Sequence, residues 1–296
     1  MSGLRVGTRG SELALRQTDS VIERLRAVHP SLCVELVTIR THGDIATDRG
    51  FDESWPVGAF VSALERALLD GRIDVAVHSY KDLQTRPTEG LAIAAVPVRE
   101  AVHDVLLTNG PLRLEELPAG ARLGTSSPRR AAQIQRLGDF EVIPVRGNVP
   151  TRIAKLQTDN LDGVILAAAG LRRLGIEHPC RIDLPPHSFV PAPGQGALAV
   201  QVRAGSEAAE LVAMLDDAAT RGAVTAERSF LRETNAGCRV PAGALAAVDG
   251  RKVSLHARLF SNDHSHDVDG VESGTDPETV GATLARRLLG ELQRLS

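Results

Sequence analysis

The sequence predicts an α/β protein built from two similar lobes, followed by a small α+β domain. Short runs rich in Val, Ile and Leu alternate with segments of helical period, and this β-α-β-α-β order occurs twice. Such alternation is typical of mainly parallel sheets covered by helices. Beyond residue 216 the pattern changes to an alternating strand between two helices. A length of 296 residues is enough for two or three domains.

The sequence predicts three strands and two helices in the first part of the first lobe. Ser11 is a suitable N-cap for the first helix. The segment 45–56 has no clear period and is predicted to be a loop. Cys33, at the start of a strand, is expected in the core. The expected elements are, in order, strand Leu4–Thr8, a helix after Ser11, strand Cys33–Ile39, a helix from Phe60 to Gly71, and strand Asp74–His78.

The second lobe repeats this theme. Ser126 or Ser127 can cap a helix that begins near Pro128, and Asn148 can cap the next one. Two connections join the lobes, a crossover near Val96–Val105 and the segment Pro191–Gly196. The expected strands are Leu123–Ser126, Glu141–Val145, Gly163–Ala167, and Ala197–Val202, which returns to the first lobe.

Two crossings of this kind predict a hinge, with a ligand cleft between the facing edges of the lobes. The predicted division is 1–97 with 195–215 for the first lobe, 98–194 for the second, and 216–296 for the α+β domain. In that last domain we expect a helix Asp217–Glu233 that ends at Asn235–Gly237 and a half-buried strand over Val253–Leu259. Thr275–Glu278 resembles a capping box before the final helix.

Arginines are concentrated between residues 122 and 152. Six arginines stand there against Asp139 and Glu141, a local charge of +4 in a chain whose net charge is −3. Arg129 and Arg130 fall in the first turn of a helix, where the dipole disfavours cations by roughly 0.3–1 kcal/mol each. They make sense there if an anion binds between them. The alternative is a solvated basic surface.

The arginines recur at one topological position. Each of three predicted strands is followed by arginine, and the carboxyl ends of parallel strands share one edge of a sheet. We therefore expect the side chains to converge on a ligand that carries carboxylates or phosphates. The arginines concerned are Arg129, Arg130, Arg146, Arg152 and one of Arg172 or Arg173.

Other classes of function find little support. The net charge of −3 argues against bulk nucleic-acid binding. No apolar run is long enough to span a membrane, and the N-terminus lacks a signal-peptide pattern. Phosphate-loop and dinucleotide motifs are missing, and no metal site is predicted, because the turn holding His264 and His266 matches no common ligand spacing. Three cysteines at no metal-ligand spacing fit a reducing cytoplasm.

Two further residues could carry chemistry. Asp82 follows a predicted buried strand and could move a proton or stabilise a cationic intermediate, although it could equally cap the next turn. Cys238 lies in a Gly-Cys-Arg-Val-Pro turn, where Arg239 could lower its pKa. The alternatives for Cys238 are a small buried apolar side chain or an idle thiol.

An ordered set of motifs resembles the porphobilinogen deaminase family, also called hydroxymethylbilane synthase. The resemblance covers essentially the whole chain, and the set is specific although each motif alone is modest. The motifs are Thr8–Ser11, His78–Asp82, Gly124–Arg130, Arg146–Asn148 with Thr151–Arg152, Ala169–Leu171 with Arg173–Gly175, Pro193–Ala197, and Gly237–Cys238.

The resemblance implies an activity and a fold. Members join four porphobilinogen molecules head to tail, each losing ammonia, and release the linear tetrapyrrole hydroxymethylbilane. They carry a dipyrromethane cofactor held by a thioether to a cysteine, which corresponds to Cys238, and their catalytic aspartate corresponds to Asp82. The family fold has two hinged lobes like those of periplasmic binding proteins, with mixed, mainly parallel sheets. A cytoplasmic monomer that hands its product to the next enzyme is also implied.

The remaining site residues follow from the same correspondence. The carboxylate-binding positions are Arg9, Lys81, Arg129, Arg130, Arg146, Arg152 and Arg173. Other polar contacts to cofactor or substrate correspond to Ser11, Ser79, Thr125, Ser127 and Gln195. Many relatives have a lysine before the second helix, and the segment 45–59 has none. Arg49 is a hypothetical substitute.

Two competing readings remain. A two-lobed anion-binding protein without catalysis would explain the hinge and the arginines, but it would not explain Cys238 in its turn. A degenerate homologue that has lost turnover would not need to retain Asp82 and Cys238.

Overall fold

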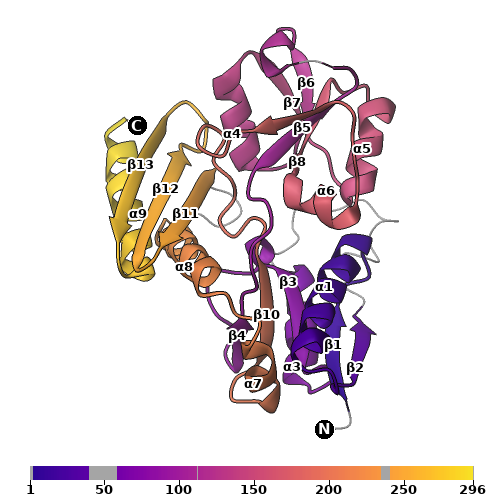
Figure 1. Ribbon diagram of the computed structural model, residues 1–296. Helices are drawn as coiled ribbons and strands as arrows, with labels where there is room; N and C mark the ends of the chain where they lie inside the picture. The colour runs from indigo at the N-terminus through magenta and orange to yellow at the C-terminus, as the bar shows by residue number, and fades with distance from the viewer. Residues whose placement is uncertain (1–2, 40–58, 112, 235–240, 296) are drawn as a thin grey trace. The chain divides into compact units, whose positions relative to one another are not determined.

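A computed structural model describes residues 3–39, 59–111, 113–234 and 241–295. The chain divides into two compact units (Figure 1). The N-terminal unit comprises Met1–Arg99 and Ala197–Arg221, and the second unit comprises Glu100–Gly196 and Gly222–Ser296. The predicted loop 45–56, Arg49, the Asn235–Gly237 signal and Cys238 lie outside the described residues.

The N-terminal unit contains a five-stranded mixed sheet in the order β2-β1-β3-β10-β4. β1 is parallel to β2 and β3, whereas β10 is antiparallel to β3 and β4. The strands are β1 (Leu4–Thr8), β2 (Val34–Thr38), β3 (Val75–Ser79), β4 (Leu91–Ala95) and β10 (Leu198–Arg203). The predicted return of the chain to the first lobe after Pro191–Gly196 is therefore confirmed.

Helices cover both faces of this sheet. The helices are α1 (Glu12–Val28), α3 (Ala59–Leu69), the short 3-10 helix η2 (Tyr80–Asp82) and α7 (Glu207–Ala213). Because side chains alternate along a strand, Val75 and Val77 of β3 join the core beneath α1, while Ala76 joins the core with Leu64 and Leu68 of α3. Ser11 caps α1 as predicted, accepting a hydrogen bond from the Ala14 N–H.

The expectation that Cys33 is a core residue is wrong. Its side chain is exposed, and it precedes β2, whose residues are exposed or half-buried. β2 is the edge strand of its sheet, so it has one neighbouring strand instead of two. Apolar composition alone does not distinguish an edge strand from a central one.

The second unit repeats the same sheet topology, with the order β7-β6-β8-β5-β9. β6 is parallel to β7 and β8, and β5 is antiparallel to β8 and β9. The two lobes are therefore similar, as predicted. The strands are β5 (Asp104–Thr108), β6 (Ala121–Gly124), β7 (Phe140–Ile143), β8 (Gly163–Ala167) and β9 (Arg181–Leu184).

Each sheet contains one strand that runs antiparallel to its neighbours and follows a segment connecting the two lobes. This strand is β10 in the N-terminal unit and β5 in the second unit. β5 was not predicted as a strand, because its start falls in the Val96–Val105 segment read only as a crossover. Its residues are all buried, since it lies between two strands and beneath helices on both faces.

The helices of this second sheet begin where the sequence predicts. Ser127 accepts from the Arg130 N–H at the start of α4, and Asn148 accepts from the Thr151 N–H at the start of α5. The core beneath α4 includes Ile134, and a separate core beneath α5 includes Leu156. The helices are η3 (Leu114–Glu116), α4 (Pro128–Leu137), α5 (Val149–Thr158) and α6 (Ala168–Leu174).

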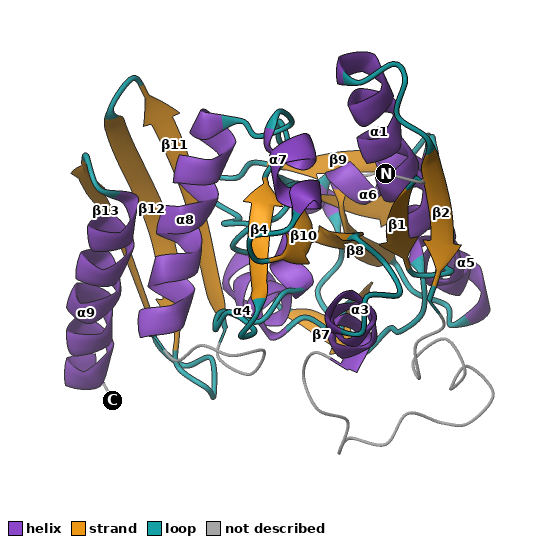
Figure 2. Ribbon diagram, turned by 90° about the horizontal axis from the view of Figure 1, so that it is seen from below, coloured by secondary structure: helices purple, strands orange, loops and turns teal. Residues whose placement is uncertain are grey.

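The C-terminal part is an antiparallel three-stranded sheet packed against two helices (Figure 2). Its elements are α8 (Ala218–Glu233), β11 (Ala242–Asp249), β12 (Lys252–Phe260), β13 (Asp267–Gly274) and α9 (Pro277–Leu295). The capping box at Thr275 is wrong by one residue: α9 begins at Pro277, and Asp276 accepts from the Thr279 N–H at 2.9 Å. A carboxylate serves this purpose as well as a hydroxyl.

No helix in the described ranges is long and apolar enough to cross a membrane.

Candidate active site

Four of the predicted site residues line one pocket of the N-terminal unit. The pocket holds about 90 Å³ and lies at the carboxyl ends of β1 and β3. The predicted residues that line it are Arg9, Ser11, Ser79 and Asp82, together with Leu13, Ala14, Gln17, Leu64, Val77 and His78. A guanidinium, two hydroxyls and a carboxylate thus meet in one hollow.

Parallel strand pairing explains this convergence. β1 and β3 are neighbours and run in the same direction, so the residues that follow them meet at one edge. Arg9 follows β1 directly, and Ser11 caps the helix that comes next. The 3-10 turn after β3 is closed by the Leu83 N–H, which donates to the Tyr80 carbonyl. Lys81 and Asp82 are exposed in that turn, and only Asp82 lines the pocket.

Gln17 is a pocket residue that the sequence analysis missed. It is buried on α1, and its amide group makes two contacts with Ser79: Nε2 donates to Oγ at 2.9 Å, and Oε1 lies 3.2 Å from the same oxygen. The contacts fix the Ser79 hydroxyl at the pocket wall. A signal was available, because Gln17 follows Ala14 and precedes Val21 on the apolar face of a predicted helix.

His78 is a second residue that was not singled out. It is 6% exposed, at the end of β3. Burial lowers the pKa of His78 to about 4, and the charge of Arg9 adds to this effect, while a hydrogen bond with Gln201 opposes it. The imidazole is therefore neutral near pH 7, and the charges at the pocket are those of Arg9 and Asp82.

In the second unit, Arg129 and Arg130 do enclose an anion, and that anion is Asp104 of β5. Nη2 of Arg129 donates to Oδ2 of Asp104 at 2.8 Å, and Nη2 of Arg130 donates to Oδ1 at 2.6 Å. Burial alone would raise the pKa of Asp104, but the charges of the two arginines outweigh it and hold that pKa well below its usual range. From the sequence we expected a bound ligand between these arginines, because the strand β5 was not predicted.

The arginine pair carries more positive charge than Asp104 neutralises. Two cations against one carboxylate leave a net charge of +1. The Nε atoms of Arg129 and Arg130 are buried and have no hydrogen-bond partner among the described residues. That Arg129 and Arg130 bind a carboxylate of a ligand stays a prediction.

The neighbouring strand–helix junctions bring further predicted residues to the same sheet edge. β7 and β8 both run parallel to β6, so the residues after all three strands share one edge. The Ser126 hydroxyl donates to the Val145 carbonyl at 2.8 Å and ties two junctions together. Arg146 is exposed at the second junction. Arg152 is half-buried, and its Nε donates to the Gly147 carbonyl at 2.8 Å.

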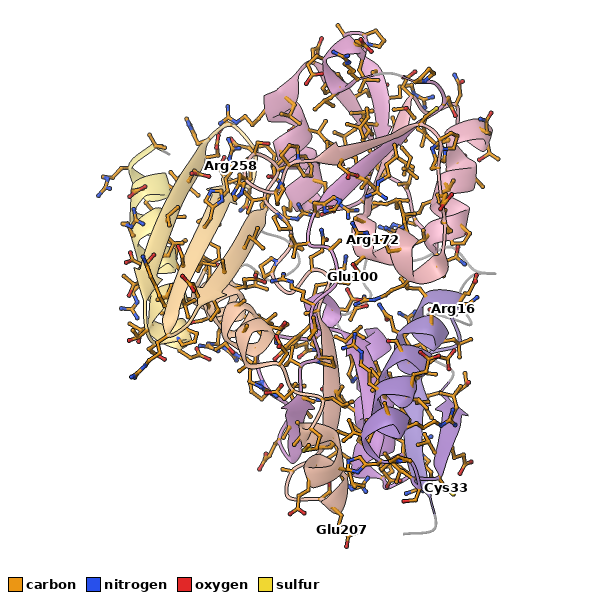
Figure 3. All side chains as sticks on the ribbon, viewed as in Figure 1. Arg16, Cys33, Glu100, Arg172, Glu207 and Arg258 are labelled. Atoms are coloured by element: carbon orange, nitrogen blue, oxygen red, sulfur yellow. The ribbon has the colours of Figure 1, made fainter. Side chains whose placement is uncertain are left out.

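The third junction separates the roles of two adjacent arginines. Arg172 is half exposed and forms an ion pair with Glu100 at 3.0 Å (Figure 3). Arg173 instead donates from Nη2 to the Gly196 carbonyl at 2.6 Å. The sequence left open which of the two would serve the site. Both arginines therefore have partners within the protein, and the binding role of Arg173 stays a prediction.

Three predicted polar residues make contacts close to the Arg129–Arg130 pair: Thr125, Ser127 and Gln195. Oγ1 of Thr125, a buried side chain, accepts from the Ser127 N–H at 3.2 Å. Nε2 of Gln195 donates to the Val102 carbonyl at 2.7 Å and to Oδ1 of Asp104 at 3.0 Å. These residues lie where a binding role was predicted, and their observed contacts are with the protein itself.

Helix α8, which leads toward Cys238, is tied to the same region by Glu227. The Glu227 side chain is fully buried; Oε2 accepts from the Gly194 N–H at 2.7 Å, and Oε1 accepts from the Ala246 N–H at 2.9 Å. Gly194 is next to Gln195, which donates to Asp104, the partner of Arg129 and Arg130. The contacts of Glu227 therefore anchor α8 close to the Arg129–Arg130 pair. Cys238 itself lies outside the described residues.

No group of metal-ligating side chains is found over the described ranges. His264 lies in the β12–β13 turn, where Nδ1 is 2.7 Å from Oε1 of Gln135. Gln135 belongs to α4, so this contact joins the turn to that helix.

Comparisons with known proteins agree with this geometry. Residues 4–211 match the sequence model "Porphobilinogen deaminase, dipyromethane cofactor binding domain" and residues 222–290 match "Porphobilinogen deaminase, C-terminal domain". Among solved structures, an ancestral cationic amino acid solute binding protein is 14% identical over 72% of this chain and 87% of its own, with a TM-score of 0.44. That match is weak, so the fold description rests on the sheets themselves.

Relatives are much closer in sequence. The porphobilinogen deaminase of Roseiflexus castenholzii is 44% identical over 97% of this chain and 96% of its own length. That of Desulforudis audaxviator is 48% identical over 96% of this chain and 93% of its own. With both family domains matched in order along nearly its whole length, this chain belongs to the porphobilinogen deaminase family.

Proposed function

We propose that this chain condenses four porphobilinogen molecules head to tail into hydroxymethylbilane, with Asp82 as the catalytic carboxylate and Cys238 as the anchor of a dipyrromethane cofactor. Family membership supports the reaction and the cofactor. The observation that supports the role of Asp82 is that it lines the same pocket as Arg9. In this proposal one substrate molecule contacts both groups: Arg9 binds its carboxylate, and Asp82 stabilises the positive charge that develops on it.

The chemistry of porphobilinogen suits these two groups. The molecule carries an acetate, a propionate and an aminomethyl group on one pyrrole ring. The aminomethyl group leaves as ammonia from its protonated form: the carbon–nitrogen bond breaks, its electron pair stays with nitrogen, and the positive charge passes to the pyrrole. A carboxylate at Asp82 stabilises that charge as it develops, which lowers the barrier. Arg9 binds a substrate carboxylate, and the neutral His78 adds no repulsive charge.

The cofactor supplies the free pyrrole position from which the chain is extended. Its carboxylates and those of the growing product need cations. The three strand–helix junctions of the second unit offer Arg146, Arg152 and Arg173, besides the Arg129–Arg130 pair. Lys81 adds an exposed cation beside the pocket. Planar guanidinium groups bind carboxylates with two parallel hydrogen bonds, and so fix direction as well as charge.

We further propose a three-domain organisation, with 1–97 and 195–215 in one lobe, 98–194 in the other and 216–296 in the cysteine-bearing domain. Porphobilinogen is the small-molecule substrate. A monomer in the cytoplasm that hands its product to the next enzyme of the pathway is the arrangement proposed for the cell. Binding to nucleic acid or membrane plays no part in it.

The intact mass of the denatured protein, measured beside that of Cys238→Ser, tests the proposal. We expect an excess of two linked pyrrole units in the parent and none in the variant. Incubation of an unmodified parent with porphobilinogen should add the same mass. A parent that gains no adduct and consumes no porphobilinogen would instead be an anion-binding protein or a degenerate homologue.

A further inference from the structure

The Arg129–Arg130 pair differs from the other predicted binding arginines because it is built around an internal carboxylate. The two arginine side chains are 6% and 7% exposed, and Asp104 is 0% exposed. The carboxylate is divided between them, with one oxygen for each guanidinium. Nothing in the proposed reaction has yet assigned a role to Asp104.

Each guanidinium is also held at a second point. Nη1 of Arg129 donates to the Val190 carbonyl at 2.7 Å, and Nη1 of Arg130 donates to the Ile165 carbonyl at 2.8 Å. A planar group held at two points cannot rotate, so its remaining N–H groups have fixed directions. Those remaining groups include the buried Nε atoms that lack a partner within the described residues.

Asp104 is itself rigidly placed. It begins β5, which is paired on both sides by β8 and β9. Its Oδ1 also accepts from Nε2 of Gln195 at 3.0 Å. A side chain on a central strand with a further hydrogen bond is the kind of support that holds a binding group to a precise geometry.

We infer that Asp104 is a positioning residue: it holds Arg129 and Arg130 in the orientation in which they receive a carboxylate of the cofactor or its precursor, without touching that ligand itself. The inference rests on the proposed function. The three groups together carry +1, so an incoming anion is still attracted. Without Asp104 the two guanidiniums would repel each other and lose their common direction.

Uptake of the cofactor by apo-protein tests the inference without relying on turnover. Apo-protein made in a host that cannot produce porphobilinogen is incubated with porphobilinogen, and the two-pyrrole adduct is followed by intact mass. Asp104→Asn removes the charge. Asp104→Glu keeps the charge but lengthens the side chain by one methylene, which displaces both guanidiniums.

A matched control comes from the N-terminal unit. Asp74 also accepts from two arginines, Arg5 at 2.8 Å and Arg203 at 3.1 Å, and none of the three lines the pocket. Asp74→Asn therefore breaks a similar ion cluster away from the predicted site. It should lower the melting temperature and leave the rate of adduct formation within twofold of the parent.

We expect both Asp104 variants to form the adduct at least tenfold more slowly than the parent at a temperature where they are folded. Parent-like uptake by Asp104→Glu would overturn the inference, because Asp104 would then only balance charge. Should Asp104→Asn fail to fold, Asp104→Glu decides alone. A parent that takes up no adduct would overturn the proposed function and this inference together, whereas a normal parent with a normal Glu variant overturns only the inference.

Discussion

At the scale of single residues, the pocket of the N-terminal unit separates groups that carry charge from groups that set geometry. Arg9 and Asp82 supply the two charges, and Gln17 holds the Ser79 hydroxyl at the wall of the same pocket. His78 is buried beside Arg9 and kept neutral. An exposed carboxylate can be changed with little effect on folding, while the buried imidazole affects stability as well.

Replacing Asp82 with Asn is expected to keep the fold and lower turnover of porphobilinogen at least 100-fold. Asp82 is exposed, so the free energy of unfolding should change by no more than about 0.5 kcal/mol. The loss of a negative charge next to a developing cation accounts for the slower reaction. Turnover per cofactor-loaded molecule and the melting temperature are measured together. Asp70→Asn, at an exposed site away from the pocket, is the control. Near-normal turnover in Asp82→Asn would remove the catalytic assignment.

His78 predicts a specific dependence of stability on pH. The pKa of His78 is about 4 in the folded protein and 6.5 for an ordinary histidine, the value taken for the unfolded chain. Between these two pH values the unfolded chain therefore binds more protons than the folded protein. Stability must therefore rise with pH through this window and fall on acidification from 6.5 to 4. The full effect is on the order of 3 kcal/mol, from 1.36 kcal/mol per pKa unit.

Urea unfolding at several pH values, for the parent and His78→Gln, measures this contribution. The variant has no imidazole to protonate, so its free energy of unfolding should change less between pH 6.5 and 4. Parallel curves for the two proteins would show that the imidazole is not held neutral by the fold.

At the scale of elements, the strand–helix junction is the recurring device of this chain. Ser11, Ser127 and Asn148 each cap a helix directly after a strand or its turn, and predicted binding residues lie close to each cap in the sequence. Local sequence is enough to predict such caps, because the cap bonds to an N–H only two or three residues away. Contacts between elements cannot be predicted in this way, because they join residues that are far apart in the sequence. The packing of α8 against α9 is an example.

Gly281 of α9 tests that packing. A Cβ at this position would lie 2.3 Å from the Ala226 carbonyl oxygen of α8, so Gly281→Ala forces the two helices apart. We expect the free energy of unfolding to fall by about 1–3 kcal/mol. Gly290 lies in the same helix with nothing within 4 Å of its Cβ position, and Gly290→Ala should be neutral or stabilising by up to about 1 kcal/mol. Equal effects of the two changes, measured by thermal unfolding, would refute the close contact.

At the scale of the whole molecule, two units of the chain contain the same sheet design. In each sheet four strands run in the same direction and one strand, β10 or β5, runs antiparallel to both of its neighbours. In each case that strand follows a segment that connects the two lobes. The alternation of strands and helices was sufficient to predict the repeat. The edge position of β2 and the strand β5 were not, because both depend on which strands become neighbours.

The sequence by itself determined the α/β class, the repeated lobes, the caps Ser11 and Asn148, and the family. Those properties depend on residues close together in the chain or on motifs in a fixed order. Only the tertiary structure decided that the anion between Arg129 and Arg130 is Asp104, that Gln17 supports Ser79, and that Arg172 pairs with Glu100. Each of these contacts joins residues 25 or more positions apart. A buried charge is satisfied by whatever partner the fold brings to it, and no local pattern records which partner that will be.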